Sequence, residues 1–133
     1  MAKIAEKYVR MWPRDLFHIQ RDGSQDILKS QLEHPGIYIL YRDSTPYYVG
    51  KADNLYTRLS AHSDIDSMYG NFWNMFSAFV VHESSFRNQL EGILIAAMPT
   101  ANRMHPKHFK RIHLPSTLKK IYFQKYEAPK GKS

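Results

Sequence analysis

The N-terminal part of the chain places apolar residues at the spacing of a helix. Ile4, Tyr8 and Met11 recur every three to four positions within residues 2–11, so they fall on one helical face. Pro13 cannot continue a helix, because its ring clashes with the preceding turn and it has no N–H to donate. The pattern therefore predicts an N-terminal helix over residues 2–11.

The pattern that follows is typical of a β-hairpin. Residues 37–41 are apolar, aromatic and β-branched, which predicts a strand buried on both faces. The polar turn at residues 43–46 contains a proline that can fix the turn backbone, and residues 47–49 predict the returning strand. Gly50 is expected to end that strand, because glycine gives the backbone freedom to bend.

After the hairpin, the pattern predicts two helices separated by a third strand, and then a short C-terminal element of undetermined type. Apolar positions at three- and four-residue spacing mark the helices, and a short, mainly apolar run marks the strand. The predicted bounds are Asp53 or Asn54 to about His62 for the first helix, 77–81 for the strand, Ser84 or Ser85 to Met98 for the second helix, and Leu118–Tyr126 for the final element.

The composition fits one globular domain, because 43% of the 133 residues are hydrophobic. The absence of cysteine excludes disulfides, a thiolate nucleophile and a cysteine-type zinc cluster. The longest apolar run, Gly92–Met98, is far shorter than the roughly 20 residues that a membrane span needs. The charged residues 1–7 contain no hydrophobic stretch like that of a signal peptide. We therefore expect an intracellular, cytoplasmic protein without membrane contact.

Positive charge is concentrated in the C-terminal part of the chain. Residues 103–133 contain nine Lys and Arg residues and one acid, a net charge of +8, whereas residues 1–102 have a net charge of −1. Such a basic segment suits contact with phosphate groups, although a run of lysines more often only keeps a surface solvated. The candidates for nucleic-acid contact are Lys51, Arg103, Lys107, Lys110 and Arg111.

Two short motifs lie on the predicted hairpin: Gly36-Ile37-Tyr38 on its first strand and Tyr48-Val49-Gly50 on its second. They are followed in chain order by Lys51, by Arg58 and His62 on the next helix, by Glu91 on the long helix, and by Asn102. In these motifs and in this order of polar residues, residues 35–102 resemble the GIY-YIG nuclease family. Val49 stands where the second motif of the family has isoleucine, a change of one methylene that keeps the strand.

The resemblance implies an α+β (mixed α/β) fold with a small, mainly antiparallel, three-stranded sheet flanked by helices. A single domain, residues 1–133, would then comprise an N-terminal helical extension (1–34), a catalytic core (35–102) and a basic C-terminal segment (103–133). Members of the family cut a phosphodiester bond with one divalent metal. The resemblance therefore implies a DNA endonuclease that uses Mg²⁺, or Mn²⁺ as a substitute, with the metal bound by Glu91.

The candidate catalytic residues are Tyr38, Tyr48, Arg58, His62, Glu91 and Asn102. A carboxylate is a hard oxygen ligand that suits Mg²⁺, and a guanidinium offers forked donors to phosphate oxygens. A tyrosine can take a proton from water at neutral pH only if its own proton is accepted elsewhere. His62 can accept it, because Arg58 lies one helical turn away and disfavours the charged imidazole. We favour Tyr38 over Tyr48 in this role, but the sequence cannot choose between them.

Several alternatives remain open at this stage. Asn102 could orient Glu91 or the waters around a metal, and Lys51 could meet a phosphate. Phe72 or Trp73 could stack on an unpaired base, although a core position is the commoner role of such aromatics. The protein could also be a noncatalytic nucleic-acid-binding module, or an assembly protein that binds a partner through its N-terminal face. The DNA substrate could be single- or double-stranded, and a homodimer is an alternative to a monomer.

Overall fold

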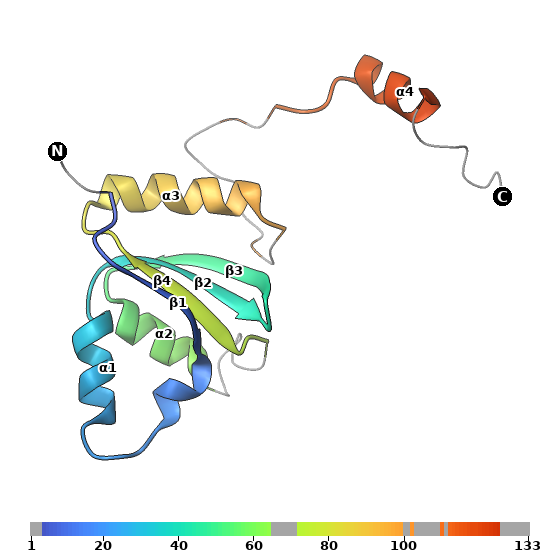
Figure 1. Ribbon diagram of the computed structural model, residues 1–133. Coiled ribbons are helices and arrows are strands. Elements are labelled where there is room, and N and C mark those ends of the chain that lie inside the picture. Colours follow the sequence, from blue (N-terminus) through green and yellow to red (C-terminus); the bar gives the residue numbers. More distant parts are fainter. Residues whose placement is uncertain (1–3, 65–71, 100–101, 103–109, 111, 126–133) are drawn as a thin grey trace.

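The computed structural model contains a four-stranded antiparallel sheet within the residues that it describes, 4–64, 72–99, 102, 110 and 112–125 (Figure 1). The strands lie in the order β1-β4-β2-β3, so β1 and β3 form the two edges. The elements in chain order are β1 (Tyr8–Pro13), the 3₁₀ helix η1 (Arg14–His18), α1 (Ser24–Leu32), β2 (Gly36–Arg42), β3 (Thr45–Ala52), α2 (Leu55–Ser63), β4 (Met75–Val80), α3 (Ser84–Ala97) and α4 (Ser116–Lys125).

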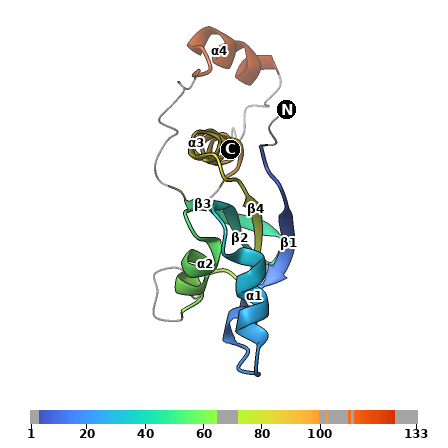
Figure 2. The same cartoon turned by 90° about the vertical axis from the view of Figure 1, so that its left-hand side faces the viewer.

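Helices cover both faces of the sheet. Helix α3 lies on one face, and α1 and α2 lie on the other (Figures 1 and 2). Side chains alternate across a strand, so β2 contributes Tyr38 and Leu40 to the core beneath α1 and α2, and Ile37 and Ile39 to the core beneath α3. This two-faced burial explains why residues 37–41 are apolar at almost every position.

The N-terminal segment differs from the prediction. Residues 8–13 form strand β1, which pairs with β4, and not the predicted helix, so the sheet has four strands where three were expected. The pairing is irregular between Val9 and Trp12, and Met11 between them has a φ of 54°. This irregularity breaks the two-residue alternation of a strand and leaves the apolar residues at a spacing that resembles a helical face.

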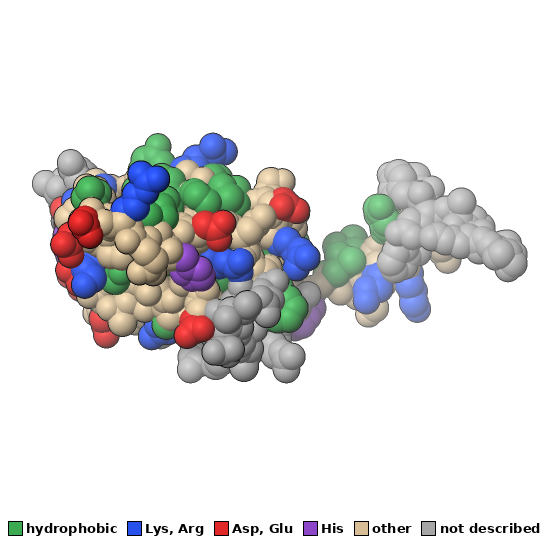
Figure 3. Space-filling model, turned by 90° about the horizontal axis from the view of Figure 1, so that it is seen from below, with side chains coloured by type: hydrophobic (Ala, Val, Ile, Leu, Met, Phe, Trp, Pro, Cys, Tyr) green, Lys and Arg blue, Asp and Glu red, His purple; other side chains and the backbone are tan. Residues whose placement is uncertain are grey.

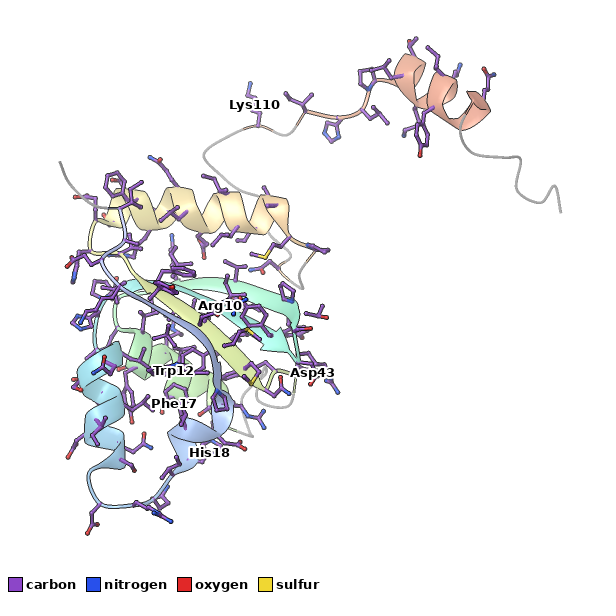
Figure 4. The ribbon with its side chains drawn as sticks, viewed as in Figure 1. Arg10, Trp12, Phe17, His18, Asp43 and Lys110 are labelled. Atoms are coloured by element: carbon purple, nitrogen blue, oxygen red, sulfur yellow. The ribbon has the colours of Figure 1, made fainter. Side chains whose placement is uncertain are left out.

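Residues 1–34 are therefore not a uniformly helical segment in the part that the structure describes. Strand β1 and η1 precede α1, and Phe17, Leu28 and Leu32 from this segment are buried in the same core as Tyr38. Figure 4 shows the labelled Trp12 and Phe17 on the side of the sheet that carries α1 and α2. The Phe17 and Phe76 rings, 5.4 Å apart, join η1 to the sheet.

The other predicted elements are present with small shifts in their bounds. Strand β3 runs past Gly50 to Ala52 and does not end at the glycine. Asn54 caps α2, since its side-chain oxygen accepts a hydrogen bond from the Thr57 N–H at 3.1 Å. Helix α3 begins at Ser84 with Glu83 as its N-cap residue, and no side chain makes a capping hydrogen bond there.

The final element is helix α4, which stands away from the sheet and α3 in both ribbon views (Figures 1 and 2). Its described side chains are exposed, among them Leu118, Ile121 and Tyr122. In the part of the chain that is described, no helix has the length and apolar character needed to cross a membrane.

Candidate active site

The hairpin brings the two motif tyrosines together on the face of the sheet that carries α2. In the register of β2 and β3, Tyr38 lies opposite Gly50 and Leu40 lies opposite Tyr48. The rings of Tyr38 and Tyr48 are 6.2 Å apart between centroids. Tyr38 is almost fully buried, whereas Tyr48 is only partly buried.

Helix α2 places His62 against both tyrosines. The Tyr38 hydroxyl and His62 Nε2 are hydrogen-bonded at 2.8 Å, and the rings of Tyr48 and His62 are 6.0 Å apart. The buried Trp73 donates a hydrogen bond from Nε1 to the His62 carbonyl at 3.2 Å. This contact fixes the last turn of α2 and therefore the direction of the imidazole.

Burial and local charge keep the tyrosine–histidine pair neutral at neutral pH. Burial and, as a smaller cause, the positive charge of Arg58 together lower the pKa of His62 to about 4, and the effect of Arg58 has the direction expected from the sequence. Burial raises the pKa of Tyr38, and Tyr48 and the negative charge of Glu91 act in the same direction. The positive charge of Arg58 and its hydrogen bond to Tyr38 act in the opposite direction. Arg58 and Glu91 are therefore both close enough to influence this hydroxyl.

The motif glycines are required by close packing. A Cβ at Gly50 would lie 2.3 Å from the Tyr38 hydroxyl oxygen, so the tyrosine ring crosses the strand where a side chain is missing. A Cβ at Gly36 would lie 2.0 Å from the Phe79 carbonyl oxygen of the neighbouring strand β4. Each glycine therefore makes room for another group of the site or of the sheet.

Helix α3 supplies Glu91 from the other face of the sheet, at the β3 edge. The Lys51 ammonium lies 3.7 Å from a carboxylate oxygen of Glu91 and donates a hydrogen bond to the Asn88 side-chain oxygen. Asn88 is not among the residues predicted from the sequence. The signal was its position three residues before Glu91, which places both side chains on one face of the helix.

Asn102 contacts the backbone of the second motif. Its Oδ1 accepts a hydrogen bond from the Val49 N–H at 2.9 Å, and its Nδ2 donates to the Val49 carbonyl at 2.7 Å. These two bonds resemble those that a neighbouring strand would make, and they join Asn102 to the outer edge of β3.

Phe72 and Trp73 have different environments. Trp73 is buried in the core, whereas Phe72 is 47% exposed and stacks on Tyr47, with ring centroids 5.9 Å apart. Among the residues predicted to contact nucleic acid, Lys51 lies on β3 and Lys110 is exposed on the segment before α4 (Figure 4). Arg103, Lys107 and Arg111 lie outside the described residues.

The side chains that could bind a metal suit a magnesium ion held by one carboxylate and by water. They do not suit a metal site that protein side chains enclose. In the described part of the chain, no cluster of three or more His, Cys, Asp or Glu side chains could hold a metal ion. Glu91 is a single, partly exposed carboxylate at the edge of the site. Mg²⁺ keeps several waters and uses one or two protein carboxylates, so Glu91 with water fits its requirements.

Solved structures of other proteins have a similar fold. The sequence matches no family model. The GIY-YIG N-terminal endonuclease domain of UvrC from Thermotoga maritima, bound to its catalytic divalent cation magnesium, is 22% identical, with a TM-score of 0.50 and coverage of 64% of this chain and 100% of that chain. Two point mutants of that domain also match. One is 24% identical, with a TM-score of 0.50 and coverage of 63% of this chain. The other is 22% identical, with a TM-score of 0.51 and coverage of 65% of this chain, and each match covers 100% of that chain. At these identities, the similarity confirms the GIY-YIG-like fold predicted from the sequence.

Proposed function

We propose that the protein is a metal-dependent endonuclease that hydrolyses phosphodiester bonds in DNA. The observation that carries the proposal is the 2.8 Å hydrogen bond between the Tyr38 hydroxyl and His62 Nε2. The bond lies beside Tyr48 and within the electrostatic reach of Arg58 and Glu91. The fold shared with an endonuclease domain that binds a catalytic divalent cation supports the same function.

Glu91 would hold the metal, which is Mg²⁺ or its substitute Mn²⁺. A bound divalent cation supplies positive charge to the scissile phosphate and acidifies a coordinated water. Glu91 is suited to this role because it is a carboxylate at the β3 edge whose negative charge acts on the Tyr38 hydroxyl. Its partial exposure leaves access for the cation and for the waters that accompany it.

Tyr38 and His62 would move the proton of the attacking water. Tyr38 takes a proton from water as it gives its own to His62. The low pKa of His62, about 4, keeps the imidazole unprotonated at neutral pH, so the Nε2 that contacts the Tyr38 hydroxyl can carry the accepting lone pair. Transfer in one step suits a buried phenol, since burial disfavours a free phenolate. Tyr48 is the alternative base, and its greater exposure also suits it to orienting the water.

Arg58 would neutralise the phosphate in the transition state. Arg58 is exposed on α2 beside the tyrosine–histidine pair, and its forked N–H donors would bind the nonbridging oxygens. Lys51 would add a second cation at the β3 edge, and Asn102 would keep that strand in place through Val49. The basic residues of the C-terminal segment, including Lys110, would hold the DNA backbone.

Incubation with DNA tests the proposal directly. The purified protein is mixed with supercoiled plasmid or circular single-stranded DNA in the presence of Mg²⁺, Mn²⁺ or EDTA, beside Glu91→Ala and the control Glu33→Ala, which changes an exposed acid at the end of α1. We expect metal-dependent cleavage that Glu91→Ala abolishes and Glu33→Ala retains. The two substrates also reveal which form of DNA is preferred.

A different outcome would support a binding module. Retardation of both DNAs in a gel, without cleavage under any metal condition, would contradict the enzyme and leave a noncatalytic nucleic-acid-binding module of the same fold. Cleavage that Glu91→Ala leaves intact would keep the nuclease but remove Glu91 as its metal ligand.

A further inference from the structure

The Lys51 ammonium lies between two acceptors of helix α3. It donates a hydrogen bond to the Asn88 side-chain oxygen, whereas the Glu91 carboxylate is 3.7 Å away. A separation of 3.7 Å allows attraction between the charges but is longer than a charge-assisted hydrogen bond, which measures about 2.7–2.9 Å. The neutral amide, and not the carboxylate, therefore makes the direct contact with the lysine.

This arrangement is unusual because a carboxylate is the stronger acceptor for an ammonium group. Lys51 is a flexible side chain, and its Nζ has only to move by about an ångström to meet Glu91 directly. The spacing of Asn88 and Glu91, three residues apart on α3, sets both acceptors beside the same stretch of β3. Asn88 thus offers the lysine a place to bind that does not occupy the carboxylate.

We propose that Asn88 is a positioning residue that holds Lys51 off Glu91 and so keeps the carboxylate open for a divalent cation. The inference rests on the proposed function, because it takes Glu91 as the metal ligand. An ammonium hydrogen-bonded to Glu91 would compete with the cation for the same oxygens, and it would oppose the cation by charge repulsion. Held on Asn88, the lysine stays close enough to meet a phosphate without blocking the metal.

The neutrality of Asn88 matters to this role. Its amide oxygen accepts from the ammonium without adding a negative charge that would draw the lysine more tightly or bind the cation itself. The Lys51 backbone is held in strand β3, where it lies opposite Ile37. Only its side chain can therefore move between the two acceptors. The residue at position 88 therefore determines which acceptor the Lys51 ammonium contacts directly.

A double-mutant cycle on metal binding tests this role without any DNA. Binding of Mn²⁺ alone to the full chain is measured from the free-Mn²⁺ signal in electron paramagnetic resonance. The variants are Asn88→Ala, Lys51→Met, the double variant, Glu91→Gln to identify the site, and Gln89→Ala as a control on the exposed face of the same helix. Alanine favours a helix, so Asn88→Ala preserves α3.

The expected result is a dependence of the Asn88 effect on Lys51. Asn88→Ala lowers the affinity about three- to fivefold, which is the size of a newly formed, partly exposed ion pair. Lys51→Met raises the affinity, and adding Asn88→Ala to Lys51→Met then changes nothing. Gln89→Ala has the affinity of the unmodified protein.

Other outcomes overturn the inference, and they separate it from the proposed function. If Asn88→Ala leaves the Mn²⁺ affinity unchanged while Glu91→Gln abolishes binding, Asn88 does not position Lys51, although Glu91 remains the metal ligand. If Asn88→Ala weakens binding equally in the Lys51→Met protein, Asn88 is itself a ligand. If the chain binds no Mn²⁺ through Glu91, both the inference and the metal site of the proposed function are wrong.

Discussion

At the scale of single residues, the two motifs combine chemistry with packing. In the proposed function Tyr38 and Tyr48 supply the reactive hydroxyl groups, whereas Gly50 leaves space for the Tyr38 ring and Gly36 leaves space for the backbone of β4. The glycine at position 50 was expected to let the chain bend, but β3 continues through it. Its role is to let the Tyr38 ring cross the strand and reach His62.

Gly50→Ala should therefore impair the site. The new methyl group would overlap the Tyr38 hydroxyl, so the ring must move and its hydrogen bond to His62 is lost. We expect a loss of stability of about 1–3 kcal/mol, as for overpacked cores, and a fall in the cleavage rate of at least about 100-fold, the lower end for a general base. Thermal unfolding and initial rates on plasmid measure the two effects, with the exposed Thr45→Ala as control. A fully active Gly50→Ala protein would contradict the requirement for this Tyr38 position.

His62 should make the stability of the protein depend on pH. Its pKa is about 6.5 in the unfolded chain and about 4 in the folded protein, so the unfolded state binds more protons between these values. The free energy of unfolding contributed by neutral His62 is thus complete above about pH 6.5 and is lost as the pH falls through about 4. Urea unfolding at pH 7 and pH 5 should show a larger loss for the unmodified protein than for His62→Gln. Equal losses would show that His62 is not buried in its neutral form.

The residues of the site could be predicted unevenly from the sequence. Tyr38, Tyr48, Arg58 and His62 were proposed from their order along the chain, which resembles that of the GIY-YIG family, and the structure brings both tyrosines and His62 together. Asn88 was not predicted, since its importance depends on where the flexible Lys51 side chain comes to lie. Such a contact joins strand and helix across 37 residues of sequence, so the spacing of Asn88 and Glu91 on one helical face does not by itself reveal it.

At the scale of elements, strand β3 carries much of the site along an edge of the sheet. One side of β3 pairs with β2, and on the other side Asn102 bonds both backbone groups of Val49. An edge strand without such a partner would present free N–H and C=O groups and would move more easily. Asn102 therefore supports the position of the neighbouring Tyr48.

Asn102→Ala should loosen β3 locally. The Val49 amide loses its acceptor, so its hydrogen exchange should become at least about tenfold faster, while amides of β3 that face β2 keep their rates. Exchange measured by NMR resolves the individual amides. An unchanged rate at Val49 would show that Asn102 does not hold the strand in solution.

The elements also show where hydrophobic patterns are sufficient. Helices α2 and α3 were predicted from the helical spacing of their apolar residues, and the hairpin strands and β4 were predicted from short apolar runs. Strand β1 was predicted as a helix because its irregular pairing at Met11 removes the alternation that identifies a strand. The fourth strand of the sheet was missed for this same physical reason.

At the scale of the whole molecule, positive charge lies mainly in the basic C-terminal segment (residues 103–133, the tail) and not in residues 1–102 (the body). Acidic and basic side chains are interspersed on the body in the space-filling view, and basic side chains also extend along the described part of the tail (Figure 3). The sequence sets net charges of −1 for residues 1–102 and +8 for residues 103–133. DNA attraction should therefore depend on the tail more than on the body.

Removing residues 116–133 should weaken the salt dependence of DNA binding. The deletion takes away five lysines and one glutamate, so the slope of log K against log salt should become shallower by up to about 4. Binding is measured in EDTA, by titration at several salt concentrations, so that cleavage does not interfere. An unchanged slope would show that this part of the tail makes no phosphate contacts.

The strand order β1-β4-β2-β3 also governs how the sheet can assemble. The β2–β3 hairpin is local in sequence, so it can close early, and with α2 it brings together the tyrosines and His62. Strand β1 is made first but pairs only with β4, where Tyr8 lies opposite Phe79, so it must wait until nearly the whole body has been synthesised. Folding should therefore bring Tyr38, Tyr48 and His62 together from contiguous chain, and close the N-terminal strand only after β4 has formed.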